Sequence, residues 1–308
     1  MKILITGGAG FIGSHVADAC ISAGHQVVIL DDLSSGKMEN VNSRANFIKL
    51  DIRDEKVRDV FRQNKIDVVI HHAAQMDVRK SVDDPKFDAS VNISGSINLL
   101  ESSKEFGVKK FIFASTGGAI YGEQDYFPAD EKHPLRPLSP YGIAKLAVEK
   151  YLFYYNSVFG VQYICLRYAN VYGPRQNPHG EAGVIAIFAS KMFSGKDPVI
   201  NGDGKQTRDY TFVGDVVRAN MFALSYDKSD IFNVGTGIET DVNELFSILK
   251  KYSGSRCTGQ HGEAKKGEQQ RSVLDNSYIR KIIGWEPGMT LDKGLELTVN
   301  YFREKIQK

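Results

Sequence analysis

The chain has 308 residues, of which 42% are hydrophobic and 25% are charged. This composition is ordinary for a globular protein, and the length allows one enlarged α/β unit or two domains. The formal net charge of +2 and the lack of a basic stretch interleaved with aromatic residues argue against nucleic acid as a partner. The three cysteines, Cys20, Cys165 and Cys257, are far apart and show no metal-ligand spacing, so we expect no metal site and no disulfide.

The ends and apolar runs of the chain bear on its location. Its first residues (MKILITGG) already predict a strand, so we expect no signal peptide. The longest apolar run, residues 183–189 (GVIAIFA), is far too short to cross a membrane. We therefore expect a cytoplasmic protein with no membrane association.

Short β-branched runs alternate with helical patterns through the first half of the chain. Such alternation predicts βαβ units and a parallel sheet, and the runs are apolar throughout, as in strands that are covered on both faces. The predicted strands are residues 2–6 (KILIT), 26–30 (QVVIL), 46–50 (NFIKL), 67–72 (DVVIHH), 109–115 (KKFIFAS) and 161–168 (VQYICLRY).

Beyond about Gly173 the pattern loosens and Gly and Pro become frequent. We predict an α/β fold with a doubly wound parallel sheet in residues 1–172. Residues 173–308 are predicted to form a smaller, mostly helical domain, partly interleaved with the first and laid over the carboxyl edge of the sheet. Doubly wound proteins bind ligands at that edge.

The stretch TGGAGFIGS, residues 6–14, follows the first predicted strand directly. Gly8, Gly10 and Gly13 match GxGxxG, and Gly7, Gly10 and Gly13 also follow one another at three-residue steps. Glycines at these positions allow a tight turn, a close approach of the backbone to a pyrophosphate, and a helix N-terminus aimed at it. We predict a dinucleotide site.

Asp31 ends the second predicted strand, 18 residues after Gly13. A carboxylate at about this spacing meets the ribose hydroxyls of the adenosine. It would repel a 2′-phosphate, and no arginine follows it, so NAD is favoured over NADP; Lys37 leaves this choice open.

Small or polar residues also follow the third and fourth predicted strands. These are Asp51 and Ile52, and then Ala73 and Ala74, positions where a dinucleotide would run along the sheet edge, although each alone is typical of any strand end. His71 and His72 are expected to be structural, because no second ligand cluster accompanies them.

The stretch SPYGIAK, residues 139–145, places Tyr141 four residues before Lys145 at the start of a predicted helix. The same spacing occurs at Tyr301 and Lys305, but that pair is remote in sequence from any cofactor motif. Ser115 and Thr116 end the fifth strand, so a hydroxyl, a tyrosine and a lysine are predicted to face one site.

A tyrosine with a pKa near 10 is a poor base at neutral pH. Lowering that pKa by two to three units requires about 3–4 kcal/mol of preferential stabilisation of the phenolate. A lysine ammonium and a cationic nicotinamide can supply this together, which makes Tyr141 a workable base for an alcohol whose carbon gives up hydride.

Seven motifs together resemble the extended short-chain dehydrogenase/reductase family, and within it the UDP-glucose 4-epimerases. They are TGGAGFIG, HHAAQ, STGGAIYG, SPYGIAK, RYANVYGPRQ, GDGKQTRDY and IIGWEP, and the similarity covers essentially the whole chain. The resemblance implies a Rossmann domain that binds NAD, a small domain for a UDP-sugar, and a homodimer joined through two helices per subunit.

The resemblance and the motifs above also give the predicted site residues. Thr116, Tyr141 and Lys145 are predicted to be catalytic, and no residue is predicted to bind metal. The predicted cofactor-binding residues are Gly7, Gly10, Phe11, Ile12, Gly13, Asp31, Asp32, Ser35, Gly36, Asp51, Ile52, His72, Ala73, Ala74, Gln75, Asn92, Ser115, Tyr141, Lys145, Tyr168 and Ala169. The predicted substrate-binding residues are Gln75, Thr116, Tyr141, Asn170, Gly183, Val184, Arg208, Lys265, Glu268 and Ser272.

Two positions bear on the type of reaction. Family members that remove water or a carboxyl group from the sugar carry acidic residues directly after the threonine, whereas this chain has Gly117 and Gly118. This favours NAD-dependent 4-epimerisation of a UDP-sugar through a 4-keto intermediate. The alternatives are another nucleotide-sugar epimerase, such as a UDP-glucuronate 4-epimerase, a reductase or dehydrogenase of the family, and a non-catalytic NAD-sensing regulator.

One segment departs from the family pattern. Epimerases of this kind typically show Arg-x-Gly-Asp where this chain has residues 265–268 (KKGE), and Arg271 or Arg208 would have to compensate. Counted from the glycine of that segment, Ser272 matches the position that limits room beside the sugar's 2-substituent. Its small side chain predicts that UDP-N-acetylglucosamine is admitted as well as UDP-glucose, unless Ser272 merely starts a strand.

Overall fold

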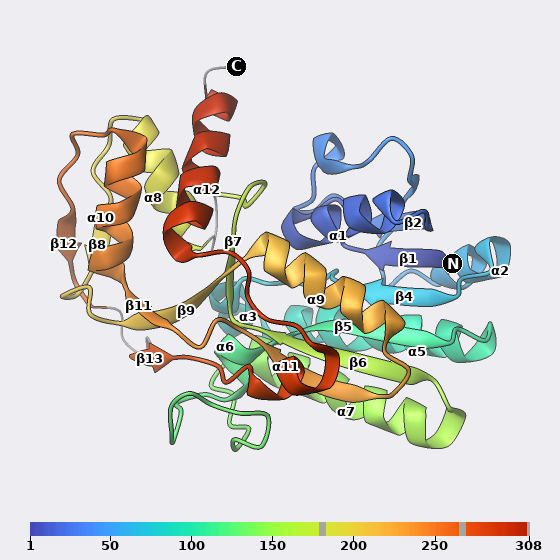
Figure 1. The fold of residues 1–308 in the computed structure, drawn as a ribbon. Coiled ribbons are helices and arrows are strands. Elements are labelled where there is room, and N and C mark those ends of the chain that lie inside the picture. The colour runs from blue at the N-terminus through green and yellow to red at the C-terminus, as the bar shows by residue number, and fades with distance from the viewer. Residues whose placement is uncertain (179–182, 265–268, 307–308) are drawn as a thin grey trace.

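The structure, a computed structural model, describes residues 1–178, 183–264 and 269–306, so Lys265 and Glu268 lie outside the described residues. Within these residues the largest sheet has seven parallel strands in the order β10-β6-β5-β4-β1-β2-β3 (Figure 1). The strands are β1 Lys2–Thr6, β2 Gln26–Asp31, β3 Asn46–Lys49, β4 Val68–His71, β5 Lys110–Thr116, β6 Gln162–Tyr168 and β10 Asp230–Val234. The first six follow the order 3-2-1-4-5-6 of a Rossmann sheet, which confirms the predicted fold class.

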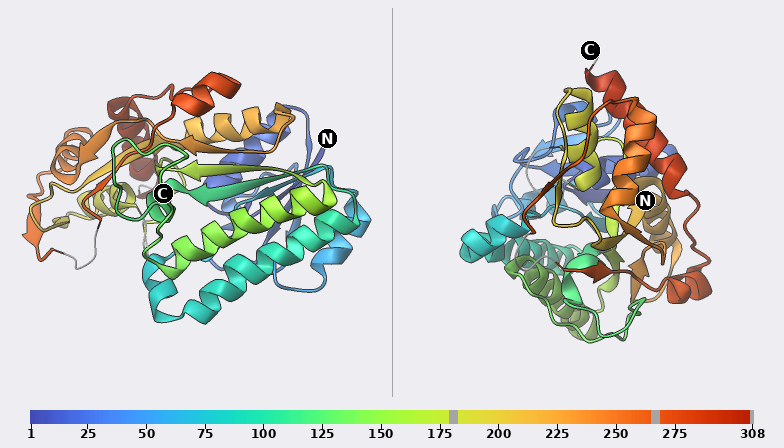
Figure 2. Two further views of the ribbon diagram at one scale, coloured as in Figure 1. Left: turned by 90° about the horizontal axis from the view of Figure 1, so that it is seen from below. Right: turned by 90° about the vertical axis from the view of Figure 1, so that its left-hand side faces the viewer.

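Both faces of this sheet are covered by helices, and successive residues of each strand feed opposite cores. Ile3 and Ile5 belong to the core beneath α1, α9 and α11, whereas Leu4 belongs to the core beneath α2, α5 and α7. Figure 2 shows α5 and α7 lying side by side on the second of these faces. The helices are α1 Phe11–Ser22, α9 Val213–Ser225, α11 Ser277–Ile283, α2 Val57–Asn64, α5 Gly95–Glu105 and α7 Pro140–Phe159.

A second lobe lies at the carboxyl side of the sheet, to the left in Figure 1. Its core includes Phe188, Leu245 and Leu295, which come from α8, α10 and α12. The elements are β7 Asn170–Tyr172, α8 Val184–Phe193, β8 Val199–Asn201, β9 Thr207–Phe212, β11 Glu239–Asp241, α10 Val242–Ser253, β12 Gln260–Gly262, β13 Arg271–Ser272 and α12 Leu291–Ile306. Three of the described elements of the C-terminal half pack with the central sheet instead: α9 packs against α1, β10 pairs with β6, and α11 packs against β10.

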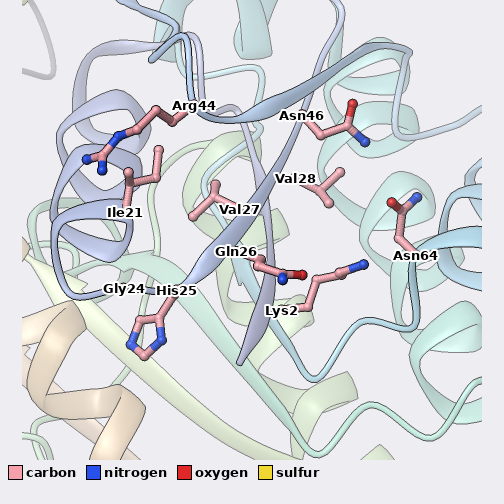
Figure 3. Close-up of a pocket in the computed structure, with 10 residues that line it drawn as sticks. All are labelled: Lys2, Ile21, Gly24, His25, Gln26, Val27, Val28, Arg44, Asn46 and Asn64. Atoms are coloured by element: carbon pink, nitrogen blue, oxygen red, sulfur yellow. The ribbon is translucent and has the colours of Figure 1, made fainter.

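Short helical segments connect the strands near their carboxyl ends. They are the 3₁₀-helix η1 Met38–Asn40, α3 Val78–Asp83, α4 Pro85–Ala89, the π-helix η2 Ser90–Ser94 and α6 Gly117–Ile120. A surface hollow lies at the opposite edge, where Lys2, Gln26 and Asn46 begin β1, β2 and β3 (Figure 3). That hollow is therefore remote from the edge at which a doubly wound sheet binds its ligand.

Candidate active site

The glycine loop between β1 and α1 has almost no room for side chains. Gly7 has a φ of +68°, and a Cβ there would lie 2.6 Å from the nitrogen of Ala73. A Cβ at Gly13 would lie 2.3 Å from the oxygen of Gly7. Gly10 is the N-cap of α1, so the amides of Phe11 and Ile12 stand at the free N-terminus of the helix, an arrangement that suits a pyrophosphate.

Asp31 is held at the carboxyl end of β2 by two backbone amides. Its Oδ2 accepts a hydrogen bond from the nitrogen of Ala9 at 3.0 Å, and its Oδ1 accepts one from the nitrogen of Leu33 at 2.8 Å. Burial raises the pKa of this carboxyl, and the two amide bonds oppose the rise. The next loop closes over it, because a Cβ at Gly36 would lie 2.7 Å from Asp31 Oδ1.

The other residues predicted on this edge are placed by local bonds. Asp32 accepts from both the nitrogen and the hydroxyl of Ser34, and Ser35 lies in the same loop. Asp51 pairs with Arg53 at 2.5 Å, and this bond lowers the pKa of the Asp51 carboxyl. Ile52 is buried beside Asp51.

The loop after β4 carries Ala73, Ala74 and Gln75. Its backbone is fixed by Asn92, which accepts from the nitrogen of Gln75 and donates to its oxygen, both at 2.9 Å. His72 stacks on Tyr168 with ring centroids 6.1 Å apart, and its Nε2 lies 3.2 Å from the Tyr168 hydroxyl. The Tyr168 hydroxyl also accepts from Asn220 at 2.8 Å, and the neighbouring Ala169 is partly buried.

Tyr141 and Lys145 lie in the first two turns of α7. Ser139 caps this helix, since its side chain accepts from the nitrogen of Gly142, and Pro140 occupies the first helical position, as the Ser-Pro step predicts. The Lys145 ammonium donates to the oxygen of Ala114 at 2.9 Å and lies 5.7 Å from the centroid of the Tyr141 ring. The lysine is thereby fixed against β5.

Thr116 ends β5 and directly precedes α6. The start of α7 packs on α6 without a gap, because a Cβ at Gly142 would lie 2.9 Å from the oxygen of Ala119. Across the sheet Thr116 is in register with Tyr168. The predicted hydroxyl, tyrosine and lysine thus come from adjoining elements at one edge of the sheet.

The electrostatics of this pair oppose charge on both groups. Burial lowers the pKa of Lys145 to about 8, and the carboxylate of Asp88 opposes that fall. Desolvation raises the pKa of the Tyr141 phenol, and the charge of Asp88 raises it further. Buried groups with pKa values perturbed in this way are typical of functional sites.

A buried network holds α7 to the sheet one turn beyond Lys145. Glu149 accepts from Arg167 on β6 at 2.7 and 3.0 Å and from the Ser115 hydroxyl at 2.6 Å. The Arg167 and Glu149 side chains are 3% and 1% exposed. The Ser115 hydroxyl, which the sequence places in the cofactor site, is committed to this network.

A small sheet around β9 gathers predicted substrate residues from distant parts of the chain. Asn170 is in register with Tyr210, and Ser272 is in register with Arg208. Gly183 is the N-cap of α8 and Val184 is its first residue. Lys265 and Glu268 lie outside the described residues.

Arg271 is not free to replace the missing arginine of the family segment. Its guanidinium donates to Glu239 at 2.8 and 2.9 Å and lies 3.8 Å from the centroid of the Phe127 ring. Contact with a diphosphate would require this pair to break.

The part of the chain that the structure describes contains neither a membrane-spanning helix nor a metal site. No helix there is long and apolar enough to cross a membrane. Across the same residues, no group of three or more His, Cys, Asp or Glu side chains could hold a metal ion.

A Rossmann sheet with a glycine loop after its first strand, and a tyrosine one helical turn before a lysine, are typical of the short-chain dehydrogenases/reductases, and the chain belongs to their extended type. Within that class the chain belongs to the NAD dependent epimerase/dehydratase family, whose model matches residues 3–235. The family's cofactor is thus the predicted one.

Known relatives match over almost the full chain. A UDP-glucose 4-epimerase of Mycolicibacterium smegmatis is 43% identical over 100% of both chains. The structure of a UDP-glucose 4-epimerase of Thermotoga maritima with UDP-glucose is 49% identical, with a TM-score of 0.98 over 99% of this chain and 100% of that one. A Thermus thermophilus UDP-glucose 4-epimerase in complex with NAD is 43% identical, with a TM-score of 0.94 over 98% and 99%.

Three residues of the site escaped the sequence reasoning. Asp88 precedes Asn92 by four positions on one helical face, and this spacing was the available signal. Glu149 follows Lys145 by the same spacing, but its partner Arg167 lies on another strand. No sequence pattern predicts an ion pair between a helix and a distant strand.

Proposed function

We propose that this chain is an isomerase that catalyses the NAD-dependent 4-epimerisation of a UDP-sugar, with UDP-glucose and UDP-galactose as the primary pair. The observation that carries the proposal is the Tyr141–Lys145 pair fixed against β5 in a chain that is 43–49% identical to UDP-glucose 4-epimerases. When bound, NAD would accept a hydride from carbon 4 of the sugar and later return it to that carbon.

In this proposal Tyr141 removes the proton of the 4-hydroxyl and later returns it, while Thr116 holds the same oxygen by a hydrogen bond. Lys145 stabilises the phenolate with its positive charge. Asn170 and Arg208, brought together by β7 and β9, contact the nucleotide-sugar phosphates. The 4-keto sugar then rotates in the site, so that the hydride returns to the opposite face of carbon 4.

The surroundings of Thr116 favour epimerisation over loss of water. A Cβ at Gly117 would lie 2.4 Å from Leu274 Cδ1, so the present packing leaves no space for an acidic side chain there. At Gly118 the nearest atom to a Cβ would be Asn170 Oδ1 at 3.6 Å, so an acid would fit, but the chain has glycine. The chain therefore offers no proton donor or acceptor at these two positions.

The proposal includes UDP-N-acetylglucosamine as a further substrate. Ser272 is 3% exposed and lies in register with Arg208, within the small sheet that gathers the predicted substrate residues. A serine at this point leaves more room than an aromatic residue would.

We also propose that two copies associate through α5 and α7. Bulky apolar side chains are exposed along α7, which is unusual for a helix that faces only water. They are Ile143, Tyr151, Phe153, Tyr154, Val158 and Phe159, with exposed fractions between 39% and 61%. Sedimentation equilibrium of the wild type and of Phe153→Lys tests this dimer, and cell fractionation tests the expected cytoplasmic location.

The function is tested by NMR of UDP-glucose, UDP-N-acetylglucosamine and UDP-glucuronate, each incubated with the pure protein and no added reductant. Appearance of the 4-epimer of the first two sugars supports the proposal. Conversion of UDP-glucuronate alone would identify a UDP-glucuronate 4-epimerase, and turnover only with added NADH would identify a reductase. Absence of any conversion by NAD-loaded protein would favour the regulator.

A further inference from the structure

Asp209 is a buried carboxylate that neither the predicted site residues nor the proposed mechanism includes. It follows Arg208 on β9 and is 1% exposed. Two distant parts of the chain meet at its side chain, the turn after β10 and the segment that continues β13. Since β10 belongs to the central sheet and β13 to the small sheet around β9, Asp209 stands where the two lobes join.

Both oxygens of the Asp209 carboxyl accept hydrogen bonds. Oδ1 accepts from the nitrogen and from the hydroxyl of Thr236, at 2.8 and 2.6 Å. Oδ2 accepts from the nitrogens of Gly237 at 3.1 Å and of Leu274 at 3.4 Å. The Thr236 hydroxyl also accepts from the nitrogen of Ile238, so its own proton is directed at Asp209. A set of donors on both oxygens suits a carboxylate, which only accepts.

The space around the carboxyl is fitted to its charged form. A Cβ at Gly235 would lie 2.5 Å from Asp209 Oδ2 and 3.0 Å from Leu274 Cβ, so a glycine is needed there. Burial raises the pKa of the Asp209 carboxyl, and its hydrogen bonds oppose that rise. A proton on Oδ2 would face backbone N–H groups, and one on Oδ1 would break the bond from the Thr236 hydroxyl. The geometry therefore fits the anion.

Leu274 connects Asp209 with the residues around the sugar. Its side chain is 1% exposed and fills the space beside Gly117, where a Cβ would lie 2.4 Å from Leu274 Cδ1. Gly117 directly follows Thr116, and Ser272 lies two residues before Leu274. A shift of the Leu274 backbone would thus reach both predicted sugar contacts, because packed interiors transmit small displacements.

The segment of residues 272–275 has a second anchor besides Asp209. The nitrogen of Ala129 donates to the oxygen of Val273 at 3.0 Å, and its oxygen accepts from the nitrogen of Asp275 at 2.8 Å. In contrast, β9 is also paired with β7 and β11, which hold it independently of this segment. Loss of the Asp209 bonds should therefore shift the segment and leave β9 in place.

We propose that Asp209 is a positioning residue that aligns the sugar end of the substrate site, at Leu274 and Ser272, with β9. The catalytic part of this role rests on the proposed function, in which Arg208 on β9 contacts the phosphates and Thr116 holds the 4-oxygen. Asp209 itself touches no substrate. It sets the offset between these two contacts, and a misplacement of about 1 Å can cost about 10²-fold in rate.

Asp209→Asn disturbs this alignment with almost no change in volume. The nitrogen of the new carboxamide is a donor. In one orientation it would face the N–H groups of Gly237 and Leu274, and in the other the two donors of Thr236. Either orientation leaves buried donors without an acceptor, which costs free energy.

Asp215→Asn is the matched control. Asp215 is 3% exposed and also accepts from two backbone amides, those of Gly288 at 3.2 Å and Met289 at 3.1 Å, as well as from Arg218 at 2.9 Å. Its amide partners lie between α11 and α12 and include no predicted site residue. The control therefore removes a comparable buried carboxylate at a joint outside the site.

The functional test compares the NAD-loaded wild type and both variants by calorimetric titration with UDP and by kinetics with UDP-glucose. Asp209→Asn is expected to lower kcat at least about tenfold, while the Kd for UDP stays within about threefold of the wild-type value. Asp215→Asn should change neither. A merely structural role would instead reduce the fraction of active molecules, and with it the stoichiometry of UDP binding, in proportion to kcat. An unchanged kcat, or a fall in kcat matched by a loss of UDP binding, would overturn the proposal.

Amide hydrogen exchange tests the anchoring without any substrate. In Asp209→Asn the peptide that contains residues 272–275 should exchange at least about tenfold faster than in the wild type or in Asp215→Asn. Exchange at the wild-type rate in Asp209→Asn would refute the anchoring. If the wild type converts no UDP-sugar, the proposed function fails, but this measurement still decides whether Asp209 holds the segment.

A milder pair of variants decides if Asp209→Asn does not fold. Thr236→Ser keeps the hydroxyl that donates to Asp209, whereas Thr236→Val replaces it with a methyl group of similar size. Thr236→Val should lower kcat at least about threefold at an unchanged Kd for UDP, because one bond to the carboxylate is lost. Thr236→Ser should retain the wild-type rate. Equal rates in these two variants would contradict the proposed role.

Discussion

Replacement of Tyr141 by phenylalanine tests the assignment of the base. The change removes one hydroxyl and keeps the ring, and Lys145 keeps its bond to the oxygen of Ala114 on β5. We therefore expect an intact fold and unchanged NAD content. A positioned general base contributes about 10²–10⁴-fold, so turnover should fall by at least ~10²-fold, about 2.7 kcal/mol of barrier.

The assay is the rate of approach to the equilibrium of UDP-glucose and UDP-galactose, followed by NMR, with bound NAD measured on the same preparation. Tyr301→Phe is the matched control, because Tyr301 also precedes a lysine by four residues but lies on α12, a helix of the second lobe. That variant should keep full activity. If Tyr141→Phe retained more than about a tenth of the wild-type rate, Tyr141 would not be the base.

Three further predictions concern cofactor choice, substrate breadth and stability. Asp31→Ser should bind NADP better relative to NAD, since a 2′-phosphate would no longer face a carboxylate, and equal binding of both by the wild type would contradict the premise. Ser272→Tyr should reduce kcat/KM for UDP-N-acetylglucosamine far more than for UDP-glucose, and an equal fall for both would show that Ser272 is not the gate. Glu149→Gln should lower the free energy of unfolding by about 3–5 kcal/mol in chemical denaturation, because it leaves the guanidinium of Arg167 buried without its counter-charge. A loss below about 1 kcal/mol would show that water or a rearranged partner compensates.

The nucleotide half of the molecule is readable from sequence because its signals are local. The glycine loop, the acid at the end of β2 and the Ser-Pro cap of α7 each lie within a few residues of the geometry they specify. Apolar runs predicted the first six strands of the central sheet to within two residues at either end. Backbone rules of this kind act over short distances, so one sequence suffices.

What could not be predicted depends on contacts between distant segments. The residues around β10 do not indicate that it extends the central sheet beside β6, where it shares a core with the distant helices α9 and α11. The pair of Glu149 and Arg167 joins residues on a helix and a strand whose register only the folded chain sets. Asp88 is similar: its neighbours Gln75 and Asn92 were predicted to be site residues, but only the folded chain brings both side-chain amides to one carboxylate.

The surroundings of Tyr141 also explain why one lysine is insufficient to make it a base. The ammonium of Lys145 lies 5.7 Å from the centroid of the Tyr141 ring, and its positive charge favours the phenolate. Desolvation and the charge of Asp88 raise the pKa of Tyr141 above its ordinary value. These two effects oppose the attraction between the ammonium and the phenolate. The remaining shift needs a second positive charge beside the ring, and a nicotinamide cation is one. A tyrosine so placed stays a phenol until the cofactor is bound, which confines its basicity to the state of the protein that can also accept the hydride.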